Sequence, residues 1–268
     1  MNAVAIYNLG QDREKRAAAL ASALGMTMYE ALSRLRSPGN GPFTIGVFAE
    51  QERAVQTEEK LRSAGFSAVV LTEGEIIAER SPLSARKFVL GENELAVVTE
   101  TGKSLIVSFQ DIRLILRGTG IVSVTATETV KNRSLSLGRA AMSGGLMITK
   151  TAKAVQEVAT EERSAFFNLY AGDNRVIVFR ENTLLFDSLG PALQPSRTLN
   201  FTYLIAELRS RSPHAEYDER LLTRPAQIAL LGPTLNPEEH LSVATALLAK
   251  TLGLLLTQQS QAEKPSLA

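Results

Sequence analysis

The sequence contains no cysteine and no tryptophan, and only two histidines among its 268 residues. Without cysteine there can be no disulfide, zinc finger, iron–sulfur cluster or thiol nucleophile. Because His214 and His240 are the only imidazoles, we expect no metal site that needs two or three of them. We therefore expect no metal and no cofactor.

The chain also lacks an excess of charge of either sign. Its 29 Lys and Arg residues are matched by 28 Asp and Glu residues, which gives a formal net charge of +1. Such a balance gives no global attraction to nucleic acid or to a membrane surface. Hydrophobic residues make up 44% and charged residues 21% of the chain, which is typical of a globular protein and excludes a disordered chain.

No long uninterrupted apolar run is present. The longest, residues 241–256, is broken by four polar residues, one of them Lys250, whereas a bilayer-spanning helix needs about 20 predominantly apolar residues. We expect a buried helix there rather than a membrane span. Residues 1–8 lack the basic and apolar segments of a signal peptide, so we expect a cytoplasmic protein.

The first 78 residues follow a legible order of strands and helices. Gly25 and Gly65 are expected helix ends, and Thr27 with Glu30 is a capping box at a helix start. Apolar periodicity predicts strands over 4–7, 43–48 and 66–71, and helices over 11–24, 28–36 and 50–64. This order, β-α-α-β-α-β, predicts a small two-layer domain.

Three runs carry a resemblance to a known family: residues 24–32, 54–61 and 64–69. Together they resemble the C-terminal domain of the ribosomal stalk protein, whose fold the adaptor ClpS shares. The resemblance implies that fold and a role in binding other proteins. The lysine-rich helical face of the stalk domain is missing, because the matching positions hold Met28, Tyr29, Ser33 and Arg34. No site residue is carried over.

The rest of the chain changes character. Residues 73–85 are polar and charged with one proline and read as a linker. About eight short strands are then expected up to residue 186, followed by helices over 196–211 and 219–230 and by a last, apolar helix. Residues 85–210 loosely resemble the pleckstrin-homology-like domains of bacteria in element order.

We therefore predict an α+β fold, in which the two-layer domain precedes a β-rich barrel or roll closed by C-terminal helices. The predicted divisions are 1–78 for the first domain, 85–257 for the second and 258–268 for a flexible tail.

Positive charge is concentrated between residues 113 and 153. This segment contains seven Lys and Arg residues and a single acid, Glu128. Such a cluster predicts an anion-binding surface for a nucleotide, a lipid headgroup or nucleic acid. The alternative is that the strands scatter these charges over both faces. Aromatic residues are absent from 110–165, which argues against stacking of single-stranded nucleic acid. The candidate ligands are Arg113, Arg117, Lys131, Arg133, Arg139 and Lys150.

A second candidate site follows the loop 189–195. Ser196 is the expected N-cap of the next helix, and Arg197, Asn200 and Tyr203 could line a partner groove there. The alternative is that they fix the loop to the body of the domain.

Catalysis finds little support in the sequence. Ser143, in Met142-Ser143-Gly144-Gly145, is similar to the serine of a nucleophile elbow, but no series of parallel strands and helices surrounds it. We assign no catalytic residue and expect a non-catalytic adaptor or regulatory protein-interaction protein, with another protein as its partner. The alternatives are a module that binds an anionic ligand through 113–153 and, third, a serine hydrolase.

Overall fold

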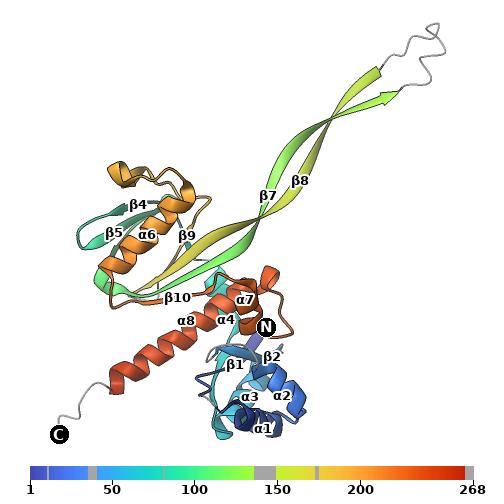
Figure 1. The fold of residues 1–268 in the computed structure, drawn as a ribbon, viewed down its shortest axis with the longest axis vertical. Helices are drawn as coiled ribbons and strands as arrows, with labels where there is room; N and C mark the ends of the chain where they lie inside the picture. The colour runs from blue at the N-terminus through green and yellow to red at the C-terminus, as the bar shows by residue number, and fades with distance from the viewer. Residues whose placement is uncertain (11, 36–40, 81, 136–148, 173–174, 263–268) are drawn as a thin grey trace. The chain divides into compact units, whose positions relative to one another are not determined.

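The computed structural model describes residues 1–10, 12–35, 41–80, 82–135, 149–172 and 175–262. The chain divides into two compact units, Met1–Gly120 with Ser164–Ala268 and, separately, Ile121–Arg163. The fold is α+β, as predicted, with mixed sheets and C-terminal helices (Figure 1).

The first sheet has three strands in the order β2-β1-β3, and both neighbours run antiparallel to β1. The strands of this sheet and the helices between them are, in chain order, β1 (Asn2–Tyr7), α1 (Arg13–Leu24), α2 (Met28–Leu35), β2 (Phe43–Phe48), α3 (Gln51–Ser63) and β3 (Ser67–Leu71). The predicted β-α-α-β-α-β order is thus confirmed. Val4 and Ile6 pack in one cluster with residues of all three helices, so these helices cover one face of the sheet.

The predicted helix boundaries rest on local chemistry. Gly25 ends α1 with a left-handed φ of 65°, which glycine adopts at little cost. Thr27 and Glu30 form the expected capping box, in which the backbone N–H of Thr27 donates to Glu30 Oε2 at 2.8 Å and the backbone N–H of Glu30 donates to Thr27 Oγ1 at 3.2 Å.

The interpretation of 73–85 as a linker is wrong. This segment contains α4 (Glu73–Arg80) and the start of β4 (Leu83–Leu90). A second capping box explains the helix, because the backbone N–H of Thr72 donates to Glu75 Oε2 at 2.8 Å. Ile76 is 2% exposed in the core beneath, so burial of an apolar face outweighs the high local charge.

The second sheet has seven strands in the order β10-β7-β8-β9-β4-β5-β6. Its remaining strands are β5 (Glu94–Thr99), β6 (Ser104–Ser108), β7 (Ile112–Leu135), β8 (Thr149–Ala171), β9 (Arg175–Arg180) and β10 (Glu216–Leu221). The pairs β4–β9 and β7–β10 are parallel, whereas β4–β5, β5–β6 and β8–β9 are antiparallel. The strand expected over 183–186 does not form; Leu184 and Phe186 are nevertheless buried in the core.

One face of this sheet packs on α6 (Arg197–Arg211). Phe167 stacks on Phe179 with ring centroids 4.5 Å apart, and Phe201 of α6 lies 5.3 Å from Phe167. All three rings are at most 1% exposed. This aromatic group forms the centre of the larger hydrophobic cluster.

The helix predicted over 219–230 begins later than expected. Residues 216–221 form β10, and α7 (Arg224–Leu231) follows. Since Glu216–Leu221 pairs in parallel with β7, a long-range ladder determines its conformation.

The other face of β1 and β3 packs against elements from the second half of the chain. Ala3 and Leu71 share one buried cluster with Leu116 of β7, Leu231 of α7 and Leu247 of α8 (Pro237–Ala262). The predicted divisions at 78 and 85 stay a prediction, but this cluster joins residues from both sides of them.

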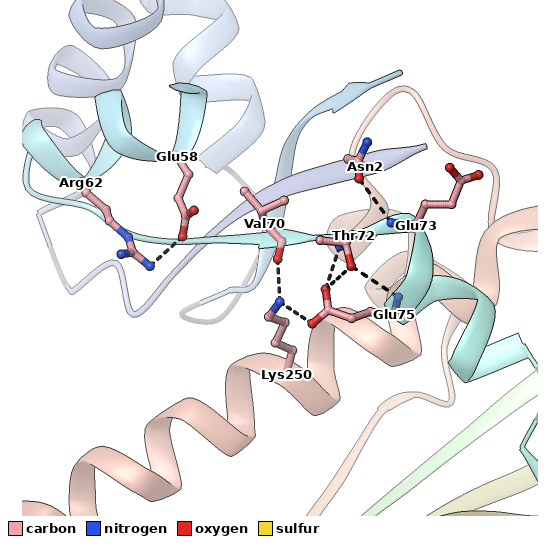
Figure 2. Close-up of polar contacts among 8 residues, drawn as sticks. All are labelled: Asn2, Glu58, Arg62, Val70, Thr72, Glu73, Glu75 and Lys250. Atoms are coloured by element: carbon pink, nitrogen blue, oxygen red, sulfur yellow. Dashed lines mark hydrogen bonds and ion pairs between the residues drawn. The ribbon is translucent and has the colours of Figure 1, made fainter. Parts of the chain in front are cut away.

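Polar contacts strengthen the same junction (Figure 2). Lys250 Nζ of α8 donates to the carbonyl oxygen of Val70 at 2.7 Å and lies 2.5 Å from Glu75 Oε1. The side chain of Asn2 accepts a hydrogen bond from the backbone N–H of Glu73 at 3.2 Å. The capped end of α4 is thereby connected to both β1 and α8.

Helix α8 is the one described helix whose length and composition could cross a bilayer. That is weak support for a span, because the core helix of a soluble protein has the same properties. Residues Val243 to Leu248 of α8 are buried, and the apolar ones belong to the cluster that contains residues of both sheets.

The second unit consists of residues 121–163, for which the backbone course of β7 and β8 is described outside 136–148. Within it the two strands are neighbours that run in opposite directions (Figure 1).

Candidate functional site

The structure places only part of the predicted anion-binding surface. Arg139 lies outside the described residues, and Lys131, Arg133 and Lys150 lie on β7 and β8 where side chains are not described. Arg113 is exposed and Arg117 is half-buried on β7.

Arg117 is engaged with a tyrosine on the neighbouring strand. Burial raises the pKa of the Tyr217 phenol, and a hydrogen bond with Arg117 lowers it in part. The Nε atom of Arg117 is buried and has no hydrogen-bond partner within the described part of the chain. This guanidinium is partly covered by its neighbours, so it is not shown to be accessible to an anion. The anion-binding surface therefore stays a prediction.

Arg113 borders a cleft of about 520 Å³ beneath the C-terminal half of α8. Its lining is mainly apolar, and His214 is the other side chain there that can carry positive charge. The exposed carboxylates Asp111 and Glu216 lie close by, since Gly172 of the cleft donates to the carbonyl oxygen of Asp111 and Glu216 pairs with Leu114. Acidic residues therefore adjoin the cleft in the fold, although neither of them lines it.

The residues of the predicted partner groove make hydrogen bonds within the chain. Arg197 Nη1 donates to the carbonyl oxygens of Glu181 and Leu184 at 2.9 and 2.8 Å. Asn200 is buried, and its side chain makes two hydrogen bonds to the backbone of Gln194. Tyr203 packs at the margin of the core. These contacts hold the loop in place, and a groove at this point stays a prediction.

A half-buried carboxylate, Glu79, lies between α4 and β8 and carries no recognisable signal in the sequence. Glu79 Oε1 accepts hydrogen bonds from Tyr170 Oη at 2.6 Å and from Asn168 Nδ2 at 2.8 Å. Burial raises the pKa of Glu79, and these two hydrogen bonds only partly oppose that shift. No ion pair to Glu79 is found among the described side chains. The cluster thus joins one carboxylate to a tyrosine hydroxyl and a side-chain amide.

Replacing Glu79 with glutamine is expected to change how stability depends on pH. A carboxyl group with a raised pKa in the folded state favours folding at low pH, and this contribution is lost as pH rises through the folded pKa. The glutamine keeps the accepting oxygen, and its amide can donate to Asn168 Oδ1, which is buried without a described partner.

Urea unfolding at several values between about pH 4 and 8 measures this effect. The stability of Glu79→Gln relative to the wild type should increase with pH. The control Glu92→Gln, in the exposed turn after β4, should run parallel to the wild type. Parallel curves for Glu79→Gln would contradict the interpretation.

The most distinctive surface in the described structure lies at the end of the seven-stranded sheet. We call it the edge surface: the exposed face of β4, β5 and β6 together with the open side of β6. Val89, Ala96 and Ile106 lie next to one another in the strand register. Val89 is 57% and Ile106 60% exposed. A hollow of about 390 Å³ covers this face, with Leu185 and Ser188 at its margin.

The hydrogen bonds at both ends of the β5–β6 pair determine which backbone groups of β6 point outward. The N–H of Thr99 donates to Lys103 O at 2.9 Å, and the N–H of Phe109 donates to Asn93 O at 3.0 Å. Bonded and non-bonded pairs alternate along an antiparallel ladder. Leu105 and Val107 therefore bond to β5, whereas Ser104, Ile106 and Ser108 direct their N–H and C=O groups to the open side.

No strand follows β6 in the described sheet order. The sequence alone does not indicate this surface, because Leu105-Ile106-Val107 has the pattern of an ordinary core strand. The neighbouring serines and the short length of the run were the available signals.

Within the described ranges, no three His, Asp or Glu side chains gather as a metal site. Ser143 lies outside the described residues, so its role as a nucleophile stays untested.

Searches of protein-family models, curated proteins and solved structures find no match to this chain. The resemblances to the stalk-protein domain, to ClpS and to pleckstrin-homology-like domains therefore stay predictions.

Proposed function

We propose that this chain is a non-catalytic adaptor or regulatory protein that binds another protein chain at the edge surface. An extended segment of the partner adds a strand next to β6. The observation that carries the proposal is the outward backbone of Ser104, Ile106 and Ser108 beside an exposed apolar row.

Strand addition supplies both affinity and selectivity. Backbone hydrogen bonds hold the incoming segment, and alternate side chains contact the face of the sheet. Ile106, Ala96 and Val89 offer apolar contacts on that face. An incoming segment with an apolar residue at every second position fits this arrangement.

Within residues 104–108, the edge of β6 lacks the charges, prolines and bulges that prevent such pairing. Edge strands are usually protected by charged residues, proline or bulges. Residues 104–108 contain no charge and no proline, and their register with β5 is unbroken. A partner strand would pair with the outward backbone groups of β6 that are otherwise open to non-specific association.

The rival function, binding of an anionic ligand, has weaker support. Arg113 borders the cleft under α8, but exposed Asp111 and Glu216 lie close to it. An anion there would meet both attraction and repulsion. At the edge surface Lys87 and Asp187 also line the hollow, but the row formed by Val89, Ala96 and Ile106 is itself uncharged, so contact with it needs no ionic attraction.

The proposal is tested by amide hydrogen exchange with a defined probe, a soluble peptide of alternating valine and threonine flanked by lysines. In dilute protein, the amides of Ser104, Ile106 and Ser108 should exchange quickly and those of Leu105 and Val107 slowly. The peptide should slow the first three by about tenfold.

The control peptide has proline at every second position and cannot complete the ladder. If the valine–threonine peptide leaves the exchange of the three outward amides unchanged, or if the proline peptide protects them equally, the proposal is wrong.

A further inference from the structure

We infer that the partner strand at the edge surface is β6 of a second copy of this chain. This inference rests on the proposed function and specifies the partner. Its basis is the sequence of β6, Ser104-Leu105-Ile106-Val107-Ser108, which has the same pattern of polar and apolar residues when read from either end.

A two-fold axis at Ile106 makes this pattern self-complementary. In an antiparallel pair of two β6 strands, Ile106 faces Ile106 of the second copy and Ser104 faces Ser108. These are the residues whose backbone groups point outward, so each facing pair can exchange both of its hydrogen bonds. Leu105 then lies opposite Val107 on the inner face. The contact is isologous and closes at two chains.

The same axis aligns the exposed apolar rows. Within one chain, Val89, Ala96 and Ile106 are cross-strand neighbours. In the pair, the row continues through Ile106, Ala96 and Val89 of the second copy. Side chains directly opposite each other on neighbouring strands stabilise a sheet, and the two exposed Ile106 side chains become such neighbours.

Charges at the ends of β6 agree with this arrangement. Residues 104–108 contain no charged side chain, so no like charges meet at the axis. Exposed Lys103 precedes the strand, and exposed Asp111 is the last residue of the short 3-10 turn that follows it. Antiparallel pairing places the lysine of one copy at the end that carries the aspartate of the other.

Disulfide trapping tests the register. The chain has no cysteine, so Ile106→Cys introduces a single thiol. Facing residues in a bonded antiparallel pair have Cα atoms about 5.5 Å apart, within the range of a disulfide. Under mild oxidation, Ile106→Cys should form a covalent dimer. Val89→Cys, at a similarly exposed position two strands away, should cross-link far more slowly. Equal rates for the two variants would overturn the inference.

Sedimentation across a range of protein concentrations tests the association itself. The wild type should reach twice the mass of one chain, and its Ser104, Ile106 and Ser108 amides should become protected as concentration rises. Ile106→Lys should weaken the dimer at least about tenfold, because two like charges would face each other. Ile77→Lys, at an exposed position on α4, should leave it intact.

The two proposals fail in different ways. A wild type that stays monomeric while the valine–threonine peptide still protects the three amides overturns the second copy as partner and supports the proposed function. A monomer whose amides the peptide does not protect overturns both.

Discussion

Replacing Gly232 with alanine is expected to lower the free energy of unfolding by about 3–5 kcal/mol. Gly232 ends α7 with φ 69° and ψ −170°. This backbone conformation is strongly unfavourable for any residue that has a Cβ atom. A Cβ at this position would lie 2.7 Å from the backbone oxygen of Thr44. That oxygen belongs to β2, and neither strand nor helix can move away easily.

One hydrogen bond joins the two sides of this contact, and a second closes the end of α7. Thr44 Oγ1 donates to the carbonyl oxygen of Leu230 at 2.7 Å, and the N–H of Gly232 donates to Ile228 O at 2.9 Å. The substitution must therefore either strain the end of α7 or break the contact between α7 and β2. Both outcomes reduce stability.

Chemical denaturation with a matched glycine control measures the effect. Gly253 lies within α8, and a methyl group added there would meet no atom within 4 Å, so Gly253→Ala should stabilise the protein by about 0.5–1 kcal/mol. If Gly232→Ala changes stability by less than about 0.5 kcal/mol, the close approach to Thr44 does not constrain the fold.

The N-terminal elements could be predicted because their signals are local. Gly25 has the left-handed conformation that ends a helix, and Thr27 with Glu30 makes a complete capping box within four residues. The predicted strands over 4–7 and 43–48 also agree with the burial of β1 and β2. Where neighbouring residues decide the structure, the sequence pattern is sufficient.

Two segments were misinterpreted because distant residues decide their structure. Residues 73–80 are highly charged, yet they form α4, since Ile76 packs in the shared core and Lys250 of α8 contacts Glu75. Residues 219–221 were predicted to begin a helix, yet residues 216–221 add a parallel strand to β7. No pattern within either segment indicates which distant residues it contacts.

The candidate sites show the same limit. Charge density between 113 and 153 does not reveal that Arg117 is half-buried against Tyr217. Conversely, Ile106 reads as a core residue, because strand periodicity says nothing about whether a strand is central or at an edge. The position of β6 follows only from the order of strands in the sheet.

Replacing Leu247 with alanine is expected to cost about 2–5 kcal/mol, the usual effect of removing a large aliphatic side chain from a close-packed core. Leu247 is fully buried on α8, in the cluster that also contains Ala3 of β1 and Leu116 of β7. The cavity would therefore open within the cluster that both sheets share. We expect amide protection to fall together in β1 and β7, because both lose contacts with the same helix.

Leu254→Ala is the matched control. Leu254 lies on the same helix but is 37% exposed, so its truncation should cost about 0.5 kcal/mol or less. The decisive comparison is between the two sheets in Leu247→Ala. If β7 loses protection while β1 keeps it, the first sheet is stable without the shared core, as the predicted division into 1–78 and 85–257 requires. A joint loss of protection means instead that α8 joins the two sheets into one cooperative unit. The edge surface then belongs to that larger unit rather than to the second sheet alone.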